Sequence, residues 1–240
     1  MSTRLGNTTP SPERMAPGAA LHVEVIADLI CPFCFLGKRR LATALKAVQG
    51  PYDVSWFPWQ LNPEMPSGGV DFEDYLTRRF GSPSNIAPVL ESLAEEGKRE
   101  GIAFRFDQLT RVPNTFRAHQ VMYLAETEGR DQSALAEELM SGFFEHGADI
   151  GDTGVLVDLA GRHGMKADDV VHIIDDSAAR QIVANREGQV RSSGIVGVPG
   201  FLLNRRLLMI GAQDADTMVN AFDRAMFGEG TDGLESPALH

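Results

Sequence analysis

The placement of two cysteines limits the possible folds of this chain more than any other feature of the sequence. Cys31 and Cys34 lie directly after residues 21–30 (LHVEVIADLI), whose apolar, β-branched composition predicts a buried strand. Pro32 suits the first position of a helix, where an N–H group would be unpaired in any case. Apolar residues then recur near helical spacing until a Gly-Pro pair ends the segment. The sequence therefore predicts a strand that turns directly into a helix, with the cysteine pair at the junction.

The rest of the chain predicts an α/β fold with the order βαβ…ββα and a large all-helical insertion. Residues 52–59 (YDVSWFPW) are expected to form a second strand, parallel to the first through a right-handed crossover. From residue 71 to residue 193 no strand is apparent, and the composition is typical of successive helices. The helices expected there cover residues 86–100, 115–128, 133–144, 152–163, 167–175 and 177–193.

Strand character returns after the insertion. Residues 200–203 and 207–210 are short apolar runs joined by three polar residues, as in a hairpin, and a last helix is expected near residues 214–226. We accordingly expect one α/β domain made of residues 21–70 and 194–228, with the insertion at residues 71–193. Residues 1–20 and 229–240 have the polar, Gly-rich and Ser-rich or Pro-rich composition of a disordered and a flexible tail.

Charge and length exclude several classes of function. The net charge of -11 argues against nucleic acid as a partner, because affinity for phosphates comes largely from Lys and Arg. No apolar run approaches the ~18 residues that a membrane span requires, and the first residues lack the layout of a secretory signal. We therefore expect no membrane partner and a cytoplasmic protein, in which two cysteines indicate redox or metal chemistry and not a structural disulfide framework.

The spacing and position of the cysteines indicate redox chemistry. A helix N-terminus presents unpaired N–H groups and the positive end of the helix dipole, and both favour a thiolate at Cys31. We expect Cys31 to be the exposed attacking thiol, and Cys34, one turn deeper, to resolve the mixed disulfide. Half of a zinc site and a pair of inert buried thiols are weaker alternatives. Zinc would need two more ligands, and the histidines of the chain are scattered, so we expect no metal.

A proline before the returning hairpin is a second element of interest. Pro199, in Gly-Val-Pro-Gly-Phe, cannot donate to a sheet ladder and belongs at the start of a strand or in a tight turn. In isolation a turn proline is the default interpretation, since fewer than ~10% of X-Pro bonds are cis.

Several short phrases of the sequence carry a family resemblance. They are DLICPFC with LGK at residues 28–38, LNP at 61–63, PNT and AH at 113–119, GIVGVP at 194–199 and GAQ at 211–213. Together with the features above, these phrases resemble the DsbA-like branch of the thioredoxin superfamily, and more narrowly FrnE-type proteins. The resemblance implies a thioredoxin-like fold.

The resemblance implies roles for the residues around the dithiol. Val198-Pro199 would be cis and lie against the cysteines, with Pro32, Phe33 and Val198 contacting an extended substrate. Because Phe33 donates no hydrogen bond to a Cys31 thiolate, we expect a less oxidising couple than that of the strongest periplasmic oxidants.

Two roles remain open: that of the acidic residue near the cysteines, and that of the residues in the PNT and AH phrases. Family members place a buried acid six residues before the first cysteine, but Val25 stands there. Asp28 is the better candidate for a proton relay than Glu24, although an exposed acid near Cys31 would also oppose its thiolate. For Asn114, Thr115 and His119, a helix cap and a satisfied core histidine are favoured over catalysis.

Three functions follow from the sequence. The leading hypothesis is a protein disulfide oxidoreductase or isomerase that acts on thiol-bearing or disulfide-bearing proteins or small molecules, with no cofactor beyond its own dithiol. The second is a glutathione-dependent transferase or isomerase like the related kappa-class transferases and 2-hydroxychromene-2-carboxylate isomerases. The retention of both thiols favours redox chemistry, with glutathione as a possible reductant or ligand. The third is a non-catalytic accessory protein.

Overall fold

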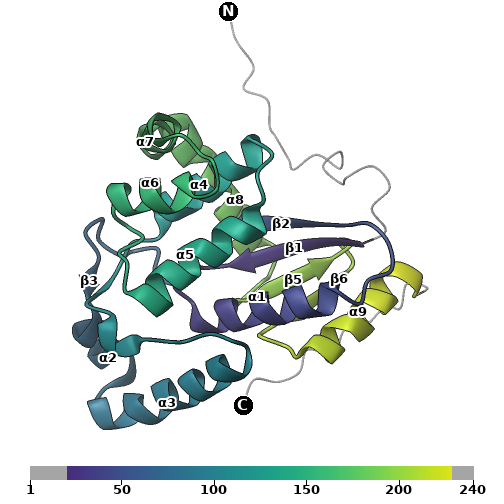
Figure 1. The fold of residues 1–240 in the computed structure, drawn as a ribbon, viewed down its shortest axis with the longest axis horizontal. Helices are drawn as coiled ribbons and strands as arrows, with labels where there is room; N and C mark the ends of the chain where they lie inside the picture. Colours follow the sequence, from purple (N-terminus) through teal and green to yellow (C-terminus); the bar gives the residue numbers. More distant parts are fainter. Residues whose placement is uncertain (1–20, 229–240) are drawn as a thin grey trace, which may run out of the picture.

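The computed structural model describes residues 21–228, and a four-stranded mixed sheet lies at its centre (Figure 1). Strand β1 (Leu21–Ala27) pairs in parallel with β2 (Tyr52–Pro58) and antiparallel with β5 (Gly200–Leu203). Strand β6 (Leu207–Ile210) continues the sheet from β5, so the order is β2-β1-β5-β6. Because β1 lies inside the sheet, all seven of its residues are buried.

Helices cover the sheet on both faces, and the alternation of side chains along β1 explains which residues each helix contacts. Helices α1 (Pro32–Leu45) and α9 (Ala215–Phe227) pack together on one face (Figure 1), where Val23 and Val25 join the main core. On the other face Ile26 packs with Trp59, Val190 and Ile195. The first strand therefore needs apolar residues on both faces, as its composition predicts.

Glu24 is a charged residue that β1 buries. It is only 7% exposed, and its carboxylate accepts a hydrogen bond of 2.7 Å from Nε of Arg205. His22 lies 3.6 Å away on the same face of the strand. The charge is buried because the hairpin connection supplies a cation for it.

The segment between β2 and β5 consists of helices with one small exception. Strands β3 (Val70–Asp71) and β4 (Arg111–Val112) form a separate two-stranded sheet, which sequence patterning did not predict because each strand has only two residues. The helices of this segment are α2 (Phe72–Phe80), α3 (Pro83–Arg99), α4 (Phe116–Thr127), α5 (Gln132–His146), α6 (Thr153–Gly161), α7 (Ala167–Asp175) and α8 (Ser177–Ser192).

An aromatic cluster joins the helical segment to the sheet domain. Phe35 of α1 lies 6.1 Å from both Phe104 and Phe144, measured between ring centroids, and Phe144 meets Phe104 edge-on at 5.2 Å. Such pairs add to the free energy gained from burial alone. The dithiol helix is thus anchored to α5, one residue after Cys34.

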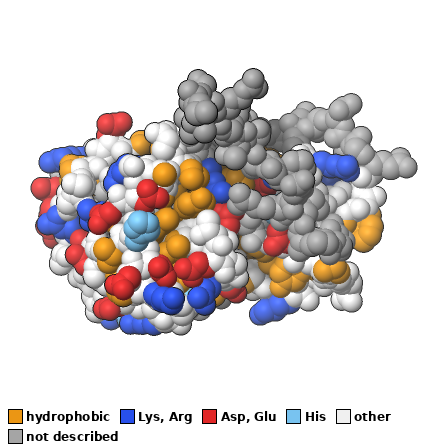
Figure 2. Space-filling model, turned by 90° about the horizontal axis from the view of Figure 1, so that it is seen from above, with side chains coloured by type: hydrophobic (Ala, Val, Ile, Leu, Met, Phe, Trp, Pro, Cys, Tyr) orange, Lys and Arg blue, Asp and Glu red, His pale blue; other side chains and the backbone are white. Residues whose placement is uncertain are grey.

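The surface shown in Figure 2 is mixed in charge. Acidic and basic side chains are interspersed over the helical part of this face, with apolar side chains between them. Among the described residues, no helix combines the length and apolarity needed to cross a membrane. The tails expected at residues 1–20 and 229–240 lie outside the described residues.

Candidate dithiol site

The two cysteines lie where the end of β1 passes into α1. Cys31 is the N-cap residue of α1 with an extended backbone (φ -91°, ψ 115°), and Pro32 occupies the first turn. The carbonyl oxygen of Cys31 accepts hydrogen bonds from the N–H groups of Cys34 at 3.0 Å and Phe35 at 3.2 Å. Within residues 21–228 the Cys31 side chain makes no capping hydrogen bond. A thiolate at this position would lie in the field of the helix terminus.

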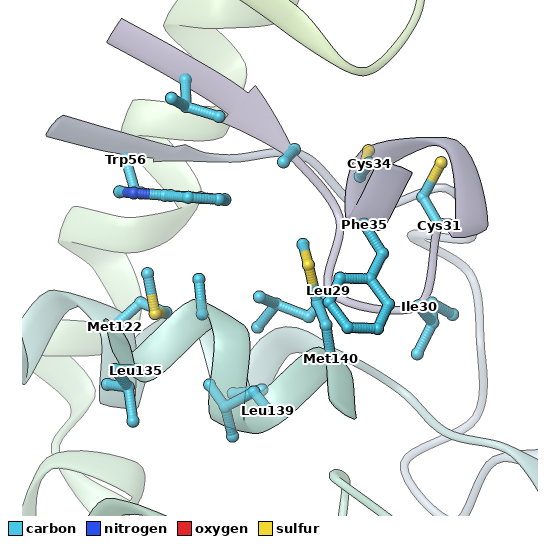
Figure 3. Close-up of a cluster of buried hydrophobic side chains, with 14 of the residues drawn as sticks. Leu29, Ile30, Cys31, Cys34, Phe35, Trp56, Met122, Leu135, Leu139 and Met140 are labelled. Carbon is cyan, nitrogen blue, oxygen red and sulfur yellow. The ribbon is translucent and has the colours of Figure 1, made fainter. Parts of the chain in front are cut away.

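Both thiols are free and largely buried. Cys31 retains 4% of its surface and Cys34 only 2%, so the expectation that Cys31 is an exposed thiol is wrong. The cause is that the neighbouring Leu29, Ile30 and Phe35 pack around the junction. Figure 3 shows the two sulfur atoms at the start of α1, on the side away from the Leu135 and Leu139 side chains of α5. Little of either sulfur-bearing side chain is therefore accessible from outside.

The environment of Cys34 favours the protonated form of its thiol. Burial raises the pKa of the Cys34 thiol well above its usual range, and the hydrogen bond and charge of Cys31 raise it further. A backbone hydrogen bond from Asp28 lowers this pKa, whereas the carboxylate charge of Asp28 raises it. The surroundings of Cys34 therefore favour the thiol over the thiolate.

Asp28 is a buried acid beside this thiol, and not the exposed acid that the sequence suggested. Its exposed fraction is 0%, and its Oδ2 atom accepts a 2.6 Å hydrogen bond from the backbone N–H of Leu61. Its Oδ1 atom faces Nε2 of His119 at 3.5 Å. Neither of these two atoms has a hydrogen-bond partner in the described part of the chain. His119 is therefore buried, at 6% exposure, but it is not the satisfied core histidine that was expected.

A second carboxylate fixes the loop that follows β2. Glu187 of α8 accepts hydrogen bonds from the backbone N–H of Gln60 at 2.7 Å and from its side-chain amide at 2.8 Å. Arg191 completes the arrangement through a 2.6 Å contact with Glu187 and a 2.5 Å hydrogen bond to the carbonyl of Gln60. Asp28 and Glu187 thus hold consecutive residues of the same loop.

The proline segment packs against the dithiol helix. The Val198–Pro199 peptide bond is cis, Pro199 is buried and Val198 is half-buried. A methyl group at Gly37, one turn after Cys34, would approach the Pro199 ring to 3.0 Å. Gly37 therefore permits the close approach of α1 to this segment.

Of the remaining residues singled out in the sequence, Phe33 lies on the surface, and Asn114 and Thr115 lie at the start of α4. Phe33 is 46% exposed beside the dithiol. Asn114 caps the chain entering α4, because its Oδ1 atom accepts the N–H of Phe116 at 2.9 Å and its amide donates to the carbonyl of Met65 at 2.7 Å. Thr115, at the N-cap position, is 3% exposed and its side chain makes no cap hydrogen bond with residues 21–228. The cap expected at Asn114 is present.

Sequence reasoning missed Gln60, Glu187 and Arg191. Glu187 lies in a helix whose sparse apolar stripe gave no sign that an acidic residue would be buried. The close packing at Gly37 could have been found from the sequence, since a glycine inside a helical pattern indicates either a weak helix or close packing.

The described residues also contain a pocket of about 300 Å³ beside this loop, lined by Arg117 and Arg180 together with Gln60 and Asn114. They contain no group of three or more His, Cys, Asp or Glu side chains arranged to hold a metal ion.

A four-stranded mixed sheet, with two cysteines at the start of the helix after its central strand and a cis-proline packed on that helix, defines a thioredoxin-fold protein. Comparison with known families agrees with this class. Residues 22–223 match the family model of the DsbA-like thioredoxin domain, and the chain belongs to this family.

Individual proteins show the same relationship. The chain is 28% identical to the probable DsbA oxidoreductase SCO1869 of Streptomyces coelicolor, with a TM-score of 0.78 over 90% of this chain and 94% of that one. It is 27% identical over 147 residues to the uncharacterized protein YwbO of Bacillus subtilis strain 168, which is 60% of this chain and 67% of YwbO. The fold is also similar to that of the cytosolic disulfide reductase DsbM of Pseudomonas aeruginosa, solved with GSH. That match has 18% identity and a TM-score of 0.54 over 85% of this chain and 95% of DsbM.

Proposed function

We propose that this chain catalyses thiol–disulfide exchange, with Cys31 as the attacking thiol and Cys34 as the resolving thiol. The observation that carries the proposal is the asymmetry of the pair. Cys31 occupies the N-cap position of α1, where a thiolate is favoured, whereas Cys34 lies deeper and keeps its proton. One thiol is therefore suited to attack first and the other to act only after a base removes its proton.

The reaction then has two steps in the reducing direction. The Cys31 thiolate attacks a substrate disulfide, forms a mixed disulfide and displaces one substrate sulfur as a thiolate. Cys34 next loses its proton to Asp28 and attacks the Cys31 sulfur, which forms the Cys31–Cys34 disulfide and releases the second substrate thiolate. The buried carboxylate of Asp28 is the proposed acceptor because its charge acts directly on Cys34.

The surroundings of the dithiol support an extended or protruding substrate segment. Phe33 and Val196 are exposed apolar side chains, at 46% and 79%, that adjoin the dithiol and the Val198–Pro199 segment in the sequence. Pro32, Phe33 and Val198 are proposed to contact the substrate, and Pro199 to position it over the sulfurs. Thiol-bearing or disulfide-bearing proteins or small molecules fit this description.

An insulin-reduction assay tests the proposal. The wild type should accelerate the reduction of insulin by dithiothreitol, Cys31→Ser should abolish the acceleration, and the exposed control Phe227→Ser should keep it. Equal activity of the wild type and Cys31→Ser would refute the dithiol mechanism. Redox titration against glutathione should give a potential below the ~-120 mV of DsbA, and a value near that figure would contradict the expectation drawn from Phe33.

Glutathione-dependent transfer or isomerisation is a second candidate. It is favoured by the pocket that contains Arg117 and Arg180, because two guanidinium groups and the Asn114 amide suit the carboxylates of glutathione. A glutathione conjugation assay separates the two candidates. Conjugation that persists in Cys34→Ser and is lost in Arg180→Ala would favour this second function.

A further inference from the structure

We propose that His119 takes the resolving proton from Asp28 and delivers it to a small internal cavity, away from the dithiol. The inference rests on the proposed thiol–disulfide exchange and extends it with an exit path for the proton. Two observations carry the argument: the unpaired buried atoms of Asp28 and His119 that face one another, and a small cavity lined by the residue His119.

The first observation is the contact between Asp28 and His119. The Oδ1 atom of Asp28 and the Nε2 atom of His119 lie 3.5 Å apart, and both lack a hydrogen-bond partner among residues 21–228. Buried polar atoms are nearly always hydrogen-bonded, so an unpaired pair requires an explanation. One proton shared between the two atoms would satisfy both, which is the arrangement expected while a proton passes from one to the other.

The second observation is the cavity. A void of about 20 Å³ is lined by His119 together with Ala27 and Leu29, the two neighbours of Asp28 in the chain. This volume is sufficient for one water molecule. Asp28 itself does not line the void, whereas His119, whose Nε2 atom faces the Asp28 carboxylate, does.

The cavity adjoins the outside of the sheet. Trp56, Tyr123 and Arg186 line both the small void and a groove of about 1430 Å³ that runs along β2, α5 and α8. Phe57 and Gln132 also line both, so a proton released at His119 would cross a wall made of side chains that face the groove as well. The path leaves from the β2 edge, whereas substrate approaches at the start of α1.

The proton balance is simple. As Cys34 attacks Cys31, its proton moves to Asp28, while the Cys31–substrate bond breaks and the substrate leaves as a thiolate. Asp28 then passes the proton to Nε2 of His119, and the imidazolium releases it to water in the cavity. Asp28 returns to its carboxylate form, and no electron moves along this path.

Several charged or titratable groups surround the pair formed by Asp28 and His119. Cys31 and Cys34 face the Asp28 side from α1, and Glu187 of α8 interacts electrostatically with His119. Arg191 neutralises part of the Glu187 charge. Across the cavity, Arg186 pairs with Glu126 and lies over the ring of Tyr123, 4.8 Å from its centroid. Asp28 and Glu187 are thus the two carboxylates that face or interact with the imidazole.

A single-turnover experiment tests the path. Reaction of Cys31 with Ellman's reagent forms a mixed disulfide with thionitrobenzoate, and the later attack by Cys34 releases this coloured anion. His119→Gln should slow the release about tenfold at neutral pH, less than the full effect of a direct base, because His119 acts through Asp28. His163→Gln is the matched control, since its Nε2 atom is also buried and unpaired within the described residues, 3.9 Å from Glu138.

The steps and variants distinguish the possible failures. In a Cys34→Ser background His119→Gln should leave the loading of Cys31 unchanged, and in His119→Ala added imidazole should restore part of the release rate. Restoration in His119→Ala but not in Asp28→Asn supports the order of the path even where a variant loses stability. Equal release rates and pH profiles in wild type and His119→Gln would overturn the inference alone. A wild type that neither loads nor releases thionitrobenzoate would instead overturn the proposed function.

Discussion

Glu187→Ala should strongly destabilise the folded chain. Glu187 is only 6% exposed, and it accepts hydrogen bonds from two groups of Gln60 and from Arg191. Truncation leaves the backbone and side-chain donors of Gln60 unpaired beside the guanidinium of Arg191. Removing one partner from a buried charged network costs about 3 to 5 kcal/mol, and we expect about 4 kcal/mol here.

Two further variants show how much of the stability lost in Glu187→Ala comes from each partner of Glu187. Glu187→Gln keeps an acceptor oxygen for Gln60 and should cost about 2 kcal/mol, within the usual range for a hydrogen bond to a charged group. Arg191→Ala leaves both Gln60 donors satisfied and should cost about 1 kcal/mol, because Arg191 is partly exposed. The combined loss in the double variant should be smaller than the sum, since the residues share one network.

The stability that Glu187 contributes should also depend on pH. Burial raises the pKa of Glu187, but the hydrogen bonds from Gln60 and Arg191 outweigh burial and hold this pKa below its usual value. The ionised carboxylate therefore stabilises the fold above the unfolded pKa of about 4.3, and this contribution is lost as pH falls through the lowered folded value. The difference between wild type and Glu187→Gln should shrink over that acidic range.

Urea unfolding followed by circular dichroism measures these free energies at neutral and acidic pH. A loss below about 1 kcal/mol for Glu187→Ala would refute the reasoning, because that is the cost of an ordinary exposed position. A difference between wild type and Glu187→Gln that grew as pH fell would contradict the sign of the pKa shift.

Three other changes follow from the same contacts. Gly37→Ala should cost about 1 to 3 kcal/mol in urea unfolding and lower insulin reduction, because its methyl group would lie 3.0 Å from both Pro199 and Phe201. The control Gly188→Ala meets no described atom within 4 Å and should stabilise α8 by about 0.5 to 1 kcal/mol; equal effects of the two changes would contradict the packing argument. Hydrogen bonding to Glu24 and the charge of Asp53 raise the pKa of His22 against the effect of burial. The advantage of wild type over His22→Gln should therefore be complete below about pH 6.5 and disappear as pH rises through the higher folded pKa; an advantage that grew with pH would have the wrong sign. Phe144→Ala should cost about 3 to 5 kcal/mol in thermal and urea unfolding, since Phe144 is 2% exposed and contacts four other rings, and a cost near 1 kcal/mol would contradict its central place.

Local patterns predicted the elements that depend on local signals. Strands β5 and β6 and helix α7 have the bounds expected, because apolar runs and polar turn residues mark their ends. The hairpin between β5 and β6 places Asn204 and Arg205 at positive φ, which three polar residues permit. Helix α2 was not delimited from the sequence, although Asp71 caps it through the N–H of Asp74.

The sequence predicted the cysteine pair of the candidate site, but not the buried polar contacts around it. The junction of strand and helix placed Cys31 and Cys34 correctly, because it depends on neighbours in the chain. The burial of Asp28 and Cys31 depends on segments distant in the sequence, and the contact between Asp28 and His119 joins residues 91 positions apart. No periodicity or spacing predicts such contacts, which arise only when α4 and α8 pack near the end of β1.

The most direct test of the proposed chemistry is to trap the covalent intermediate. Reduced Cys34→Ser protein, mixed with a disulfide-bonded peptide, should form a stable adduct that peptide mapping by mass spectrometry places on Cys31. Reduced Cys31→Ser protein should form none, because Cys34 is buried and holds its proton. An adduct on Cys34 in the second variant, or none in the first, would contradict the assignment of Cys31 as the attacking thiol.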